Sequence, residues 1–323
     1  MKLTAILLLV SCAAFAATEE NINKTFPIAS GGKLVVDVDF GSVDVSTNAA
    51  ADQVSVDVWR KVGRKNKDAE EQFFRENPVQ LVSEGNTLTV RCRTKEQNRW
   101  FSGRANRNEA KYKIHVPAQL NADLNTSGGN IAVSDLTGEV KADTSGGELH
   151  FTRLRGPLNG NTSGGDVRAA DCEGTIKVNT SGGVIEVMRG GGSLDGGTSG
   201  GDVTVKNFGG PVSVETSGGG MTIENVNGKV TASTSGGPVS AVLLAPIPGD
   251  VVLSTSGGDV KVKVPGNAGF NLEAETLGGG VTCDFPVTVQ GRIEPGHLKG
   301  PVNGGGPAVV LRTSGGEIHI KKL

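Results

Sequence analysis

Aromatic side chains are scarce in this chain of 323 residues: they make up 4% of it, with two tryptophans and one tyrosine. A thick core filled by large rings is therefore excluded, because such cores depend on the area that aromatic side chains bury. Long apolar runs are also lacking after the first residues, so no later segment is predicted to span a bilayer as a helix. Glycine supplies 49 residues instead, which favours a thin core repeated many times.

The first residues predict an export signal. A short apolar stretch at residues 3–10 is followed by a small-x-small cleavage site at residues 14–16. We therefore expect cleavage between Ala16 and Ala17, and an extracytoplasmic location in the periplasm, at the outer membrane or on the cell surface. A lipobox-like alternative stays open, in which Cys12 carries a lipid anchor.

Three cysteines follow this signal, and an odd number in an exported protein can indicate a reactive or intermolecularly paired thiol. Each of them, however, falls on the apolar phase of an alternating segment: Cys92, Cys172 and Cys283. Because free cysteine packs as a small apolar residue, we expect three buried structural thiols.

The tetrapeptide Thr-Ser-Gly-Gly dominates the sequence. It begins at seven positions that are 18 residues apart: Thr126, Thr144, Thr162, Thr180, Thr198, Thr216 and Thr234. It returns at Thr255, as Thr-Leu-Gly-Gly at Thr276, and at Thr313. Self-similarity at a fixed period of this length indicates a repeat architecture.

Each repeat contains two short runs in which apolar and polar residues alternate. The Gly-Gly pair precedes a run such as residues 130–133, and a single glycine precedes a second run such as residues 140–144. Alternation with a period of two predicts strands with one buried face. The glycines allow positive φ or close backbone packing at corners, so each repeat is predicted to be a coil of two strands and two corners.

Stacking is what allows such coils to bury their apolar face. Successive coils placed about 4.8 Å apart pair each strand with its copies above and below. The sequence therefore predicts an all-β fold, a single-stranded parallel β-solenoid of about 18 residues per coil. Parity places the motif threonine inward, where its hydroxyl can bond to other threonines and to turn backbone. An antiparallel meander competes, but it does not require the same corner residues at one phase.

One outward column supports parallel stacking in register. The residue before the apolar corner position alternates in charge and then becomes asparagine: Asp135, Arg153, Asp171, Arg189, Asn207 and Asn225. Opposite charges on neighbouring coils attract one another weakly at an exposed surface. We interpret this column as structural rather than catalytic.

Outside the regular array the pattern loosens. The chain divides into a signal peptide (1–16), irregular N-terminal coils with a basic insertion (17–120), a regular solenoid (121–275) and C-terminal coils with a cap (276–323). A short helix is expected near residues 66–77. Polar or irregular caps are expected at both ends, because they stop edge-to-edge growth of the sheets.

Several segments together resemble one bacterial family. They are the Gly-x-Val-x-Val segment at 41–45, the strand leading into Val116-Pro117, the Thr-Ser-Gly-Gly array, and the closing segments at 291–293 and 303–306. The family consists of uncharacterised adhesin-like proteins built from β-strand repeats, and the resemblance covers about residues 28–323. It implies a right-handed, single-stranded parallel β-helix outside the cytoplasm, and it offers no catalytic residues to transfer.

Polysaccharide lyases and hydrolases also use parallel β-helices, so a carbohydrate-active enzyme is the alternative function. Such chemistry needs clustered acids, often with a basic group, on an outward face. The nearest match is Glu148 and Asp166 at equivalent positions of adjacent coils, with His150 and Arg168 two residues further on. The same column continues with the neutral Val184, and surface carboxylates are usually only solvated. We therefore predict no catalytic residues.

No other pattern indicates metal or cofactor chemistry. The histidines lie far apart without a Cys or His at ligand spacing, and the glycines match no nucleotide-binding or phosphate-binding motif. Aspartates after the Gly-Gly corners (Asp166, Asp202 and Asp259) lack the calcium-binding nonapeptide repeat. An ice-binding face needs outward threonine arrays, whereas this threonine has inward parity. We expect neither a metal nor a cofactor.

One basic and aromatic stretch, residues 91–107, does not repeat. Charge is concentrated around it: residues 59–113 carry an excess of +7, which leaves −9 for the rest of the chain. Five residues are candidates for binding a partner: Arg99, Trp100, Phe101, Arg104 and Arg107.

Such a combination can hold an anionic envelope polymer, a glycan or a protein surface. Nucleic acid fits the same chemistry, but export argues against it. Alternatively, Trp100 and Phe101 fold back and cap the solenoid. Taken with the fold, these patterns predict a non-enzymatic exported adhesin or scaffold whose partner is unidentified.

Overall fold

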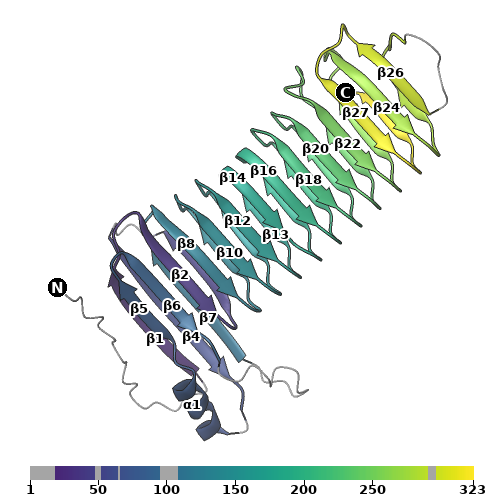
Figure 1. The fold of residues 1–323 in the computed structure, drawn as a ribbon. Helices are drawn as coiled ribbons and strands as arrows, with labels where there is room; N and C mark the ends of the chain where they lie inside the picture. Colours follow the sequence, from purple (N-terminus) through teal and green to yellow (C-terminus); the bar gives the residue numbers. More distant parts are fainter. Residues whose placement is uncertain (1–18, 48–51, 65, 95–107, 290–295) are drawn as a thin grey trace. The chain divides into compact units, whose positions relative to one another are not determined.

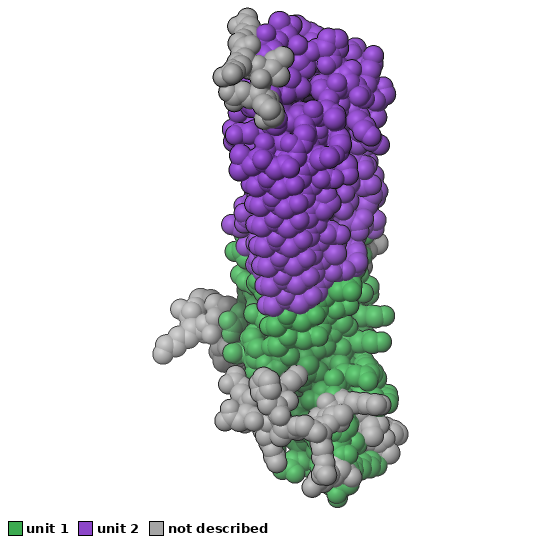
Figure 2. Space-filling model, turned by 90° about the vertical axis from the view of Figure 1, so that its right-hand side faces the viewer, with its two compact units in different colours: residues 1–150, 154–156 green, residues 151–153, 157–323 purple. Residues whose placement is uncertain are grey.

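The computed structural model describes residues 19–47, 52–64, 66–94, 108–289 and 296–323. The regular secondary structure of the described residues consists of β-strands, as the periodicity predicted, and one short helix. It forms two compact units, coloured separately in Figure 2.

Unit 1 comprises residues 1–150 and 154–156, and its described part contains helix α1 (Lys67–Glu76) and two sheets (Figure 1). The first sheet has the strand order β1 (Glu19–Pro27), β4 (Gln53–Val62), β7 (Asn108–Val116), β3 (Ser42–Thr47) and β9 (Ile131–Ser134). The second has the order β5 (Gln80–Glu84), β6 (Thr87–Cys92), β2 (Gly32–Val38), β8 (Leu120–Thr126) and β10 (Val140–Thr144).

Unit 2 comprises residues 151–153 and 157–323; β11 (Leu149–Thr152) contributes residues to both units. One sheet of unit 2 has the order β13 (Val167–Ala170), β15 (Ile185–Met188), β17 (Val203–Lys206), β19 (Met221–Glu224), β21 (Val239–Val242), β23 (Val260–Val264), β28 (Ile318–Lys322) and β25 (Val281–Cys283). The other has the order β26 (His297–Val302), β24 (Phe270–Thr276), β27 (Ala308–Thr313), β22 (Val251–Thr255), β20 (Val230–Thr234), β18 (Val212–Thr216), β16 (Gly191–Thr198), β14 (Glu173–Asn179) and β12 (Leu158–Thr162).

Pairing inside unit 2 confirms that one 18-residue repeat is one coil. Strands β16 and β18 are parallel, and their register places Thr198 beside Thr216. The same in-register parallel pairing links β17 to β19 on the opposite sheet. Inward residues such as Val205 and Leu194 are buried, so the core is a thin layer of aliphatic side chains between the two sheets.

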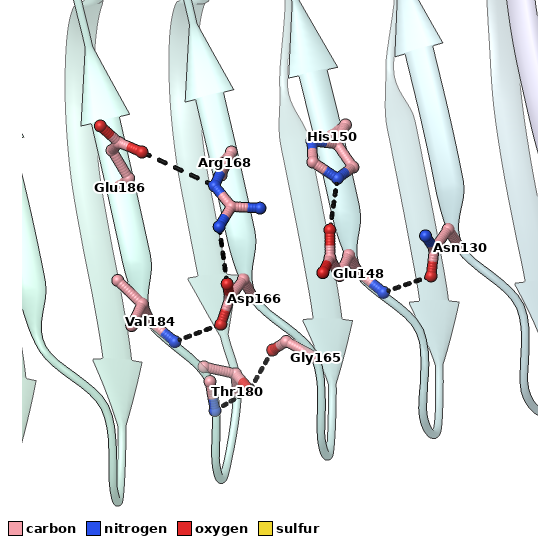
Figure 3. A network of polar contacts seen from close by, with 10 residues as sticks. Asn130, Glu148, His150, Gly165, Asp166, Arg168, Thr180, Val184 and Glu186 are labelled. Carbon is pink, nitrogen blue, oxygen red and sulfur yellow. Dashed lines mark hydrogen bonds and ion pairs between the residues drawn. The ribbon is translucent and has the colours of Figure 1, made fainter.

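The motif threonine is buried, as its parity predicted. The hydroxyl of Thr180 donates to the carbonyl of Gly165 in the preceding coil at 2.8 Å (Figure 3). It also accepts the N–H of Gly183 in its own corner at 3.2 Å. The hydroxyl therefore donates to turn backbone rather than to another threonine, and the motif links two coils.

The second glycine of the motif is required for close packing between coils. A Cβ added to Gly183 would lie 2.0 Å from the carbonyl oxygen of Gly165, whereas one added to Gly182 would meet nothing closer than 3.7 Å. Positive φ is needed elsewhere: the single corner glycine has it in the coils of Gly138, Gly156, Gly174 and Gly192, with φ of 131° at Gly174.

The residues of the outward charged column adopt the left-handed backbone conformation. Its six members, from Asp135 to Asn225, all have φ between 52° and 62°. Asp and Asn tolerate this left-handed region better than other non-glycine residues, which gives a backbone reason for four of the six. Within unit 2 the predicted pairing is confirmed, because the Arg189 guanidinium contacts both carboxylate oxygens of Asp171 at 2.8 and 2.9 Å.

The coils at the C-terminal end of unit 2 do not stack in the order of the sequence. The coil of β27 and β28 lies between the coil of β22 and β23 and the coil of β24 and β25. Leu311 is paired in register with Leu253 on one side and Ala274 on the other. The expectation that successive turns of chain lie directly over one another is therefore wrong here. The residues between β25 and β27 include β26, which pairs antiparallel with β24 and lets the chain return to an inner position.

Unit 1 has an equivalent insertion at its N-terminal end. The coil of β2 and β3 lies between that of β6 and β7 and that of β8 and β9. Leu34 is paired with Leu88 on one side and Ala122 on the other. Beyond these coils, the antiparallel pairs β1–β4, β4–β7 and β5–β6 supply the irregular end that the sequence predicted.

The predicted helix is present between two asparagines. The side chain of Asn66 accepts the N–H of Ala69 at 3.0 Å and so caps the N-terminus of α1. Asn77 ends the helix by donating its backbone N–H to the carbonyl of Phe73, whose side chain is buried.

Two of the three predicted inward thiols are fully buried, those of Cys92 and Cys172. Cys283 is only half-buried, because β25 is the edge strand of its sheet. Burial still raises the pKa of the Cys283 thiol above its ordinary value.

Candidate functional site

The polar groups of the strongest catalytic candidate are engaged in local contacts. In unit 1, the backbone N–H of Glu148 donates to the Asn130 side chain at 2.9 Å (Figure 3). The Glu148 carboxylate, just before β11, lies 2.8 Å from Nε2 of His150, two residues further along the chain. The Glu148 carboxylate therefore has a local partner on the outer face of the coil.

In unit 2, Asp166 joins one coil to the next. Its Oδ1 accepts the N–H of Val184 at 2.9 Å, and its Oδ2 lies 2.7 Å from the guanidinium of Arg168 (Figure 3). Arg168 also reaches Glu186 of the next coil, at 3.7 Å. The acid that the sequence presented as a catalytic candidate therefore bonds to backbone and to a neighbouring cation.

The other aspartates after Gly-Gly corners repeat this role. Asp202 accepts the N–H of Gly220 at 2.7 Å, and Asp259 accepts the N–H of Glu317 at 3.0 Å. That N–H, together with Lys261, lowers the pKa of the Asp259 carboxyl below its ordinary value. The sequence pattern indicated exposed acids here, but not that they receive backbone donors from the next coil.

A second polar array was missed by the sequence analysis. Thr282 Oγ1 lies 2.8 Å from Nδ1 of His319, and Nε2 of His319 lies 3.1 Å from Glu317. The order hydroxyl, imidazole, carboxylate is that of an activated nucleophile. The Thr282 hydroxyl is also 3.4 Å from the carbonyl of Ile318, and β25 is an edge strand on an outer face, so we assign the array no reaction. Thr282 and His319 are distant in sequence and meet only through the inserted coil.

The described part of the basic stretch is neutralised. Arg91 lies 3.4 Å from Asp37, and Arg93 contacts both Asp37 and Asp39, the latter at 2.7 Å. Burial favours a higher pKa for the Asp39 carboxyl, but the N–H of Thr94 and then Arg93 hold the pKa below its ordinary value. The candidate partner-binding residues Arg99, Trp100, Phe101, Arg104 and Arg107 lie outside the described residues.

A buried arginine, Arg60, lies on β4 near the N-terminal end of unit 1. Arg60 is fully buried, and its guanidinium contacts Glu20, the carbonyl of Asn77 at 2.7 Å and Sγ of Cys92 at 3.2 Å. Burial, and then the neighbouring Cys92, raise the pKa of the Tyr112 phenol above its ordinary value. Arg60 has the buried phase of β4, and only the fold shows which groups satisfy it.

Neither a metal site nor a membrane span is found in the part of the chain that the structure describes. No three His, Cys, Asp or Glu side chains gather there closely enough to hold an ion. Helix α1 has ten residues, and no described helix has the length and apolarity to cross a bilayer. The predicted cleavage site at Ala16 and Ala17 and the alternative lipidation site at Cys12 lie outside the described residues.

The sequence of the chain matches one protein-family model over most of its length. The model of the family Toastrack DUF4097 matches residues 33–321. No curated protein matches the chain.

Similar solved structures include a "putative adhesin" from Bacteroides fragilis, 12% identical with a TM-score of 0.34, over 94% of this chain and 97% of that one. Another "putative adhesin", from Parabacteroides distasonis, is 11% identical with a TM-score of 0.35, over 94% and 97%. A "putative lipid binding protein" from Parabacteroides distasonis is 13% identical with a TM-score of 0.24, over 94% and 96%. At such low TM-scores, these likenesses carry no argument about function.

Proposed function

Because the chain belongs to the Toastrack DUF4097 family, we propose that it is a non-enzymatic exported protein that presents the outer faces of a β-solenoid to a partner, as an adhesin or a scaffold. The observation that carries this proposal is the role of the outward acids. Asp166, Asp202 and Asp259 each accept a backbone N–H from the next coil. Their carboxylates hold the stack together, which favours a presenting surface over a catalytic one.

The inter-coil bonds of the motif threonines support the same proposal. Thr180, Thr198 and Thr216 each donate to a glycine carbonyl of the preceding coil, at 2.8 to 2.9 Å. Bonds that recur in successive coils oppose sliding and bending of the sheets. A stiff surface suits binding, because little conformational entropy is lost when a partner docks.

Retention and turnover on a polysaccharide panel test this function. The mature protein would be passed over immobilised neutral and acidic polysaccharides and peptidoglycan sacculi, and the eluate would be analysed for released oligosaccharides. Retention without release is the expected result. Release of oligosaccharides would favour the carbohydrate-active enzyme, and failure to bind any member of the panel would count against a polysaccharide-binding adhesin.

We further propose that the basic and aromatic segment of residues 99–107 contributes to partner binding. Alanine at both Trp100 and Phe101 is expected to reduce retention at least tenfold and to leave the melting temperature unchanged. A large fall in melting temperature would show instead that the two rings cap the solenoid.

We propose export with cleavage before Ala17, on the basis of the signal anatomy at residues 1–16. Mass spectrometry of protein isolated from its native envelope tests this directly. A mature chain that begins at Ala17 is expected. A chain that begins at a lipid-modified Cys12 would show membrane anchoring instead.

A further inference from the structure

Trp59 is unusual in this protein, which has few aromatic residues, because its side chain lies on an outer face. It lies on β4 of unit 1 and points away from the core, opposite in phase to the buried Val58 and Arg60. On the described strands of both units, the Tyr and Phe side chains have the inward phase. The residue is only partly buried, so an indole ring forms part of an outer sheet face.

Two contacts hold this indole in place. Its Nε1 donates to the Glu19 carboxylate of β1 at 3.2 Å, and the ammonium of Lys111 of β7 lies 5.7 Å from the ring centroid. The hydrogen bonds from Trp59 and Lys61 lower the pKa of the Glu19 carboxyl below its ordinary value, which keeps it ionised and accepting. A restrained aromatic ring needs little further ordering when a ligand packs against it.

Polar side chains surround the indole in rows set by strand pairing. In one row, Asn21, Trp59, Lys111 and Ser42 are directly opposite one another across β1, β4, β7 and β3. The next row contains Asn23, Asp57, Lys113 and Asp44. Neighbours in a row are about 5 Å apart, and the rows are separated by about 7 Å. Hydrogen-bond donors and acceptors therefore lie on several sides of one aromatic ring (Figure 1 labels β1, β4 and β7).

The charges of this face are nearly balanced. Three lysines on it (Lys61, Lys111 and Lys113) are interspersed with four acids (Glu19, Asp44, Asp57 and Glu109). A polyanion would meet as much repulsion as attraction on such a surface. A neutral ligand with many hydroxyls would find both donors and acceptors, and an apolar sugar face would pack on the indole.

We propose that the outer face of β1, β4, β7 and β3 binds neutral polysaccharide, with a sugar ring stacked on Trp59. Asp57 and Asn23, whose side chains are bonded to each other, accept and donate hydrogen bonds to the hydroxyls of that ring or its neighbour. Lys111 and Glu19 are positioning residues that hold the indole. The inference rests on the proposed function in one respect, that a face of the solenoid serves to bind a partner.

Affinity electrophoresis of the mature protein tests this proposal. The gels would contain galactomannan or hydroxyethylcellulose as neutral probes and polygalacturonate as the acidic probe, and mobility would be referred to polymer-free gels. Wild-type protein is expected to be retarded by at least one neutral polymer. Trp59→Ala is expected to weaken this binding at least tenfold, and Asp57→Asn about threefold.

The matched control is Thr222→Ala, because Thr222 is also an outward residue of a strand but lies in unit 2. It is expected to bind as the wild type does. Trp59→Thr removes the ring but keeps a residue suited to a strand. It is expected to weaken binding as much as Trp59→Ala, so it serves as a second variant should Trp59→Ala unfold. The part of the tryptophan fluorescence that Trp59→Thr removes is expected to shift in the wild type when the bound neutral polymer is added.

Different results would overturn the assignment of the Trp59 face and the proposed function. Neutral-polymer binding that survives both Trp59 substitutions, or retention by polygalacturonate alone, would overturn this assignment while leaving a presenting solenoid in place. Loss of binding in Trp100→Ala with Phe101→Ala but not in Trp59→Ala would assign the partner to the other segment and would likewise overturn it. Release of oligosaccharides would remove the proposed function itself.

Discussion

The coils in the middle of unit 2 are stacked in a different order from the coils at the ends of the two units. From β12 to β23, each coil lies on the coil that precedes it in sequence, one repeat away. At the N-terminal end of unit 1 and the C-terminal end of unit 2, one coil is instead inserted between two coils that the chain forms elsewhere.

This difference separates strand pairings that follow from the repeat period from strand pairings between segments far apart in the sequence. In the middle, a short segment with alternating residues and a glycine corner has its partner 18 or, at the last coil, 21 residues away, so period and place in the stack coincide. At the ends, Leu34 and Leu311 find partners on both sides that lie at unequal distances in sequence. Bringing such segments together costs more loop-closure entropy, and the gain is that the outermost coils are tied down by more than one connection.

The largest expected effect tests whether the inserted coil is as firmly held as its neighbour. Leu253 and Leu311 are paired in register and are both fully buried. Alanine at either position is expected to lower the free energy of unfolding by about 3 kcal/mol, through lost burial and the cavity left behind. Urea unfolding of the two variants measures this. A much smaller loss for Leu311→Ala would show that the inserted coil frays independently.

A smaller effect tests the packing at the corners of the regular stack. Gly183→Ala would place a Cβ against the carbonyl of Gly165, and we expect a loss of about 2 kcal/mol from overpacking. The adjacent Gly182→Ala is the matched control, since a Cβ there meets nothing closer than 3.7 Å. Thermal unfolding followed by circular dichroism compares them. Equal melting temperatures would contradict the packing explanation.

The threonine bond is expected to contribute less. Thr180→Val keeps the shape of the side chain but leaves the carbonyl of Gly165 and the N–H of Gly183 without this partner. We expect a loss of about 1 kcal/mol. The same substitution at Thr276, which donates to Gly316 of the inserted coil at 2.8 Å, is expected to cost a similar amount. Chemical denaturation of both variants decides whether the motif works alike in the middle and at the end.

The smallest expected effect concerns the outward column. Hydrogen bonding to Arg189 lowers the pKa of the Asp171 carboxyl, so this pair contributes stability that is present above the unfolded-state pKa and is lost as pH falls through the lowered pKa. Arg189→Asn should raise the pKa of Asp171 toward its ordinary value and relieve the strain at φ of 52°. NMR titration of the carboxyl measures the shift. An unchanged pKa would show that the arginine is not its cause.

Much of the fold could be predicted from the sequence because its signals are local. The phase of Thr180 predicted a buried hydroxyl, and the alternation around Cys172 predicted a buried thiol. The acids were harder: nothing in the sequence indicated that Asp166 accepts the N–H of Val184, since this contact depends on the exact offset between coils. Trp59 carried no repeat signal, and its row of polar neighbours is assembled from four strands of different parts of the chain.

The sequence by itself determined the coil: its length, its two strands and corners, the inward threonine and the thin aliphatic core. All of these follow from steric preferences and alternation within one repeat. Only the tertiary structure decided the order of the coils at the ends, the partners of the buried Arg60 and the composition of the face around Trp59. Those features depend on pairings between segments that no common period relates, and many alternative pairings would satisfy the same alternation of apolar and polar residues.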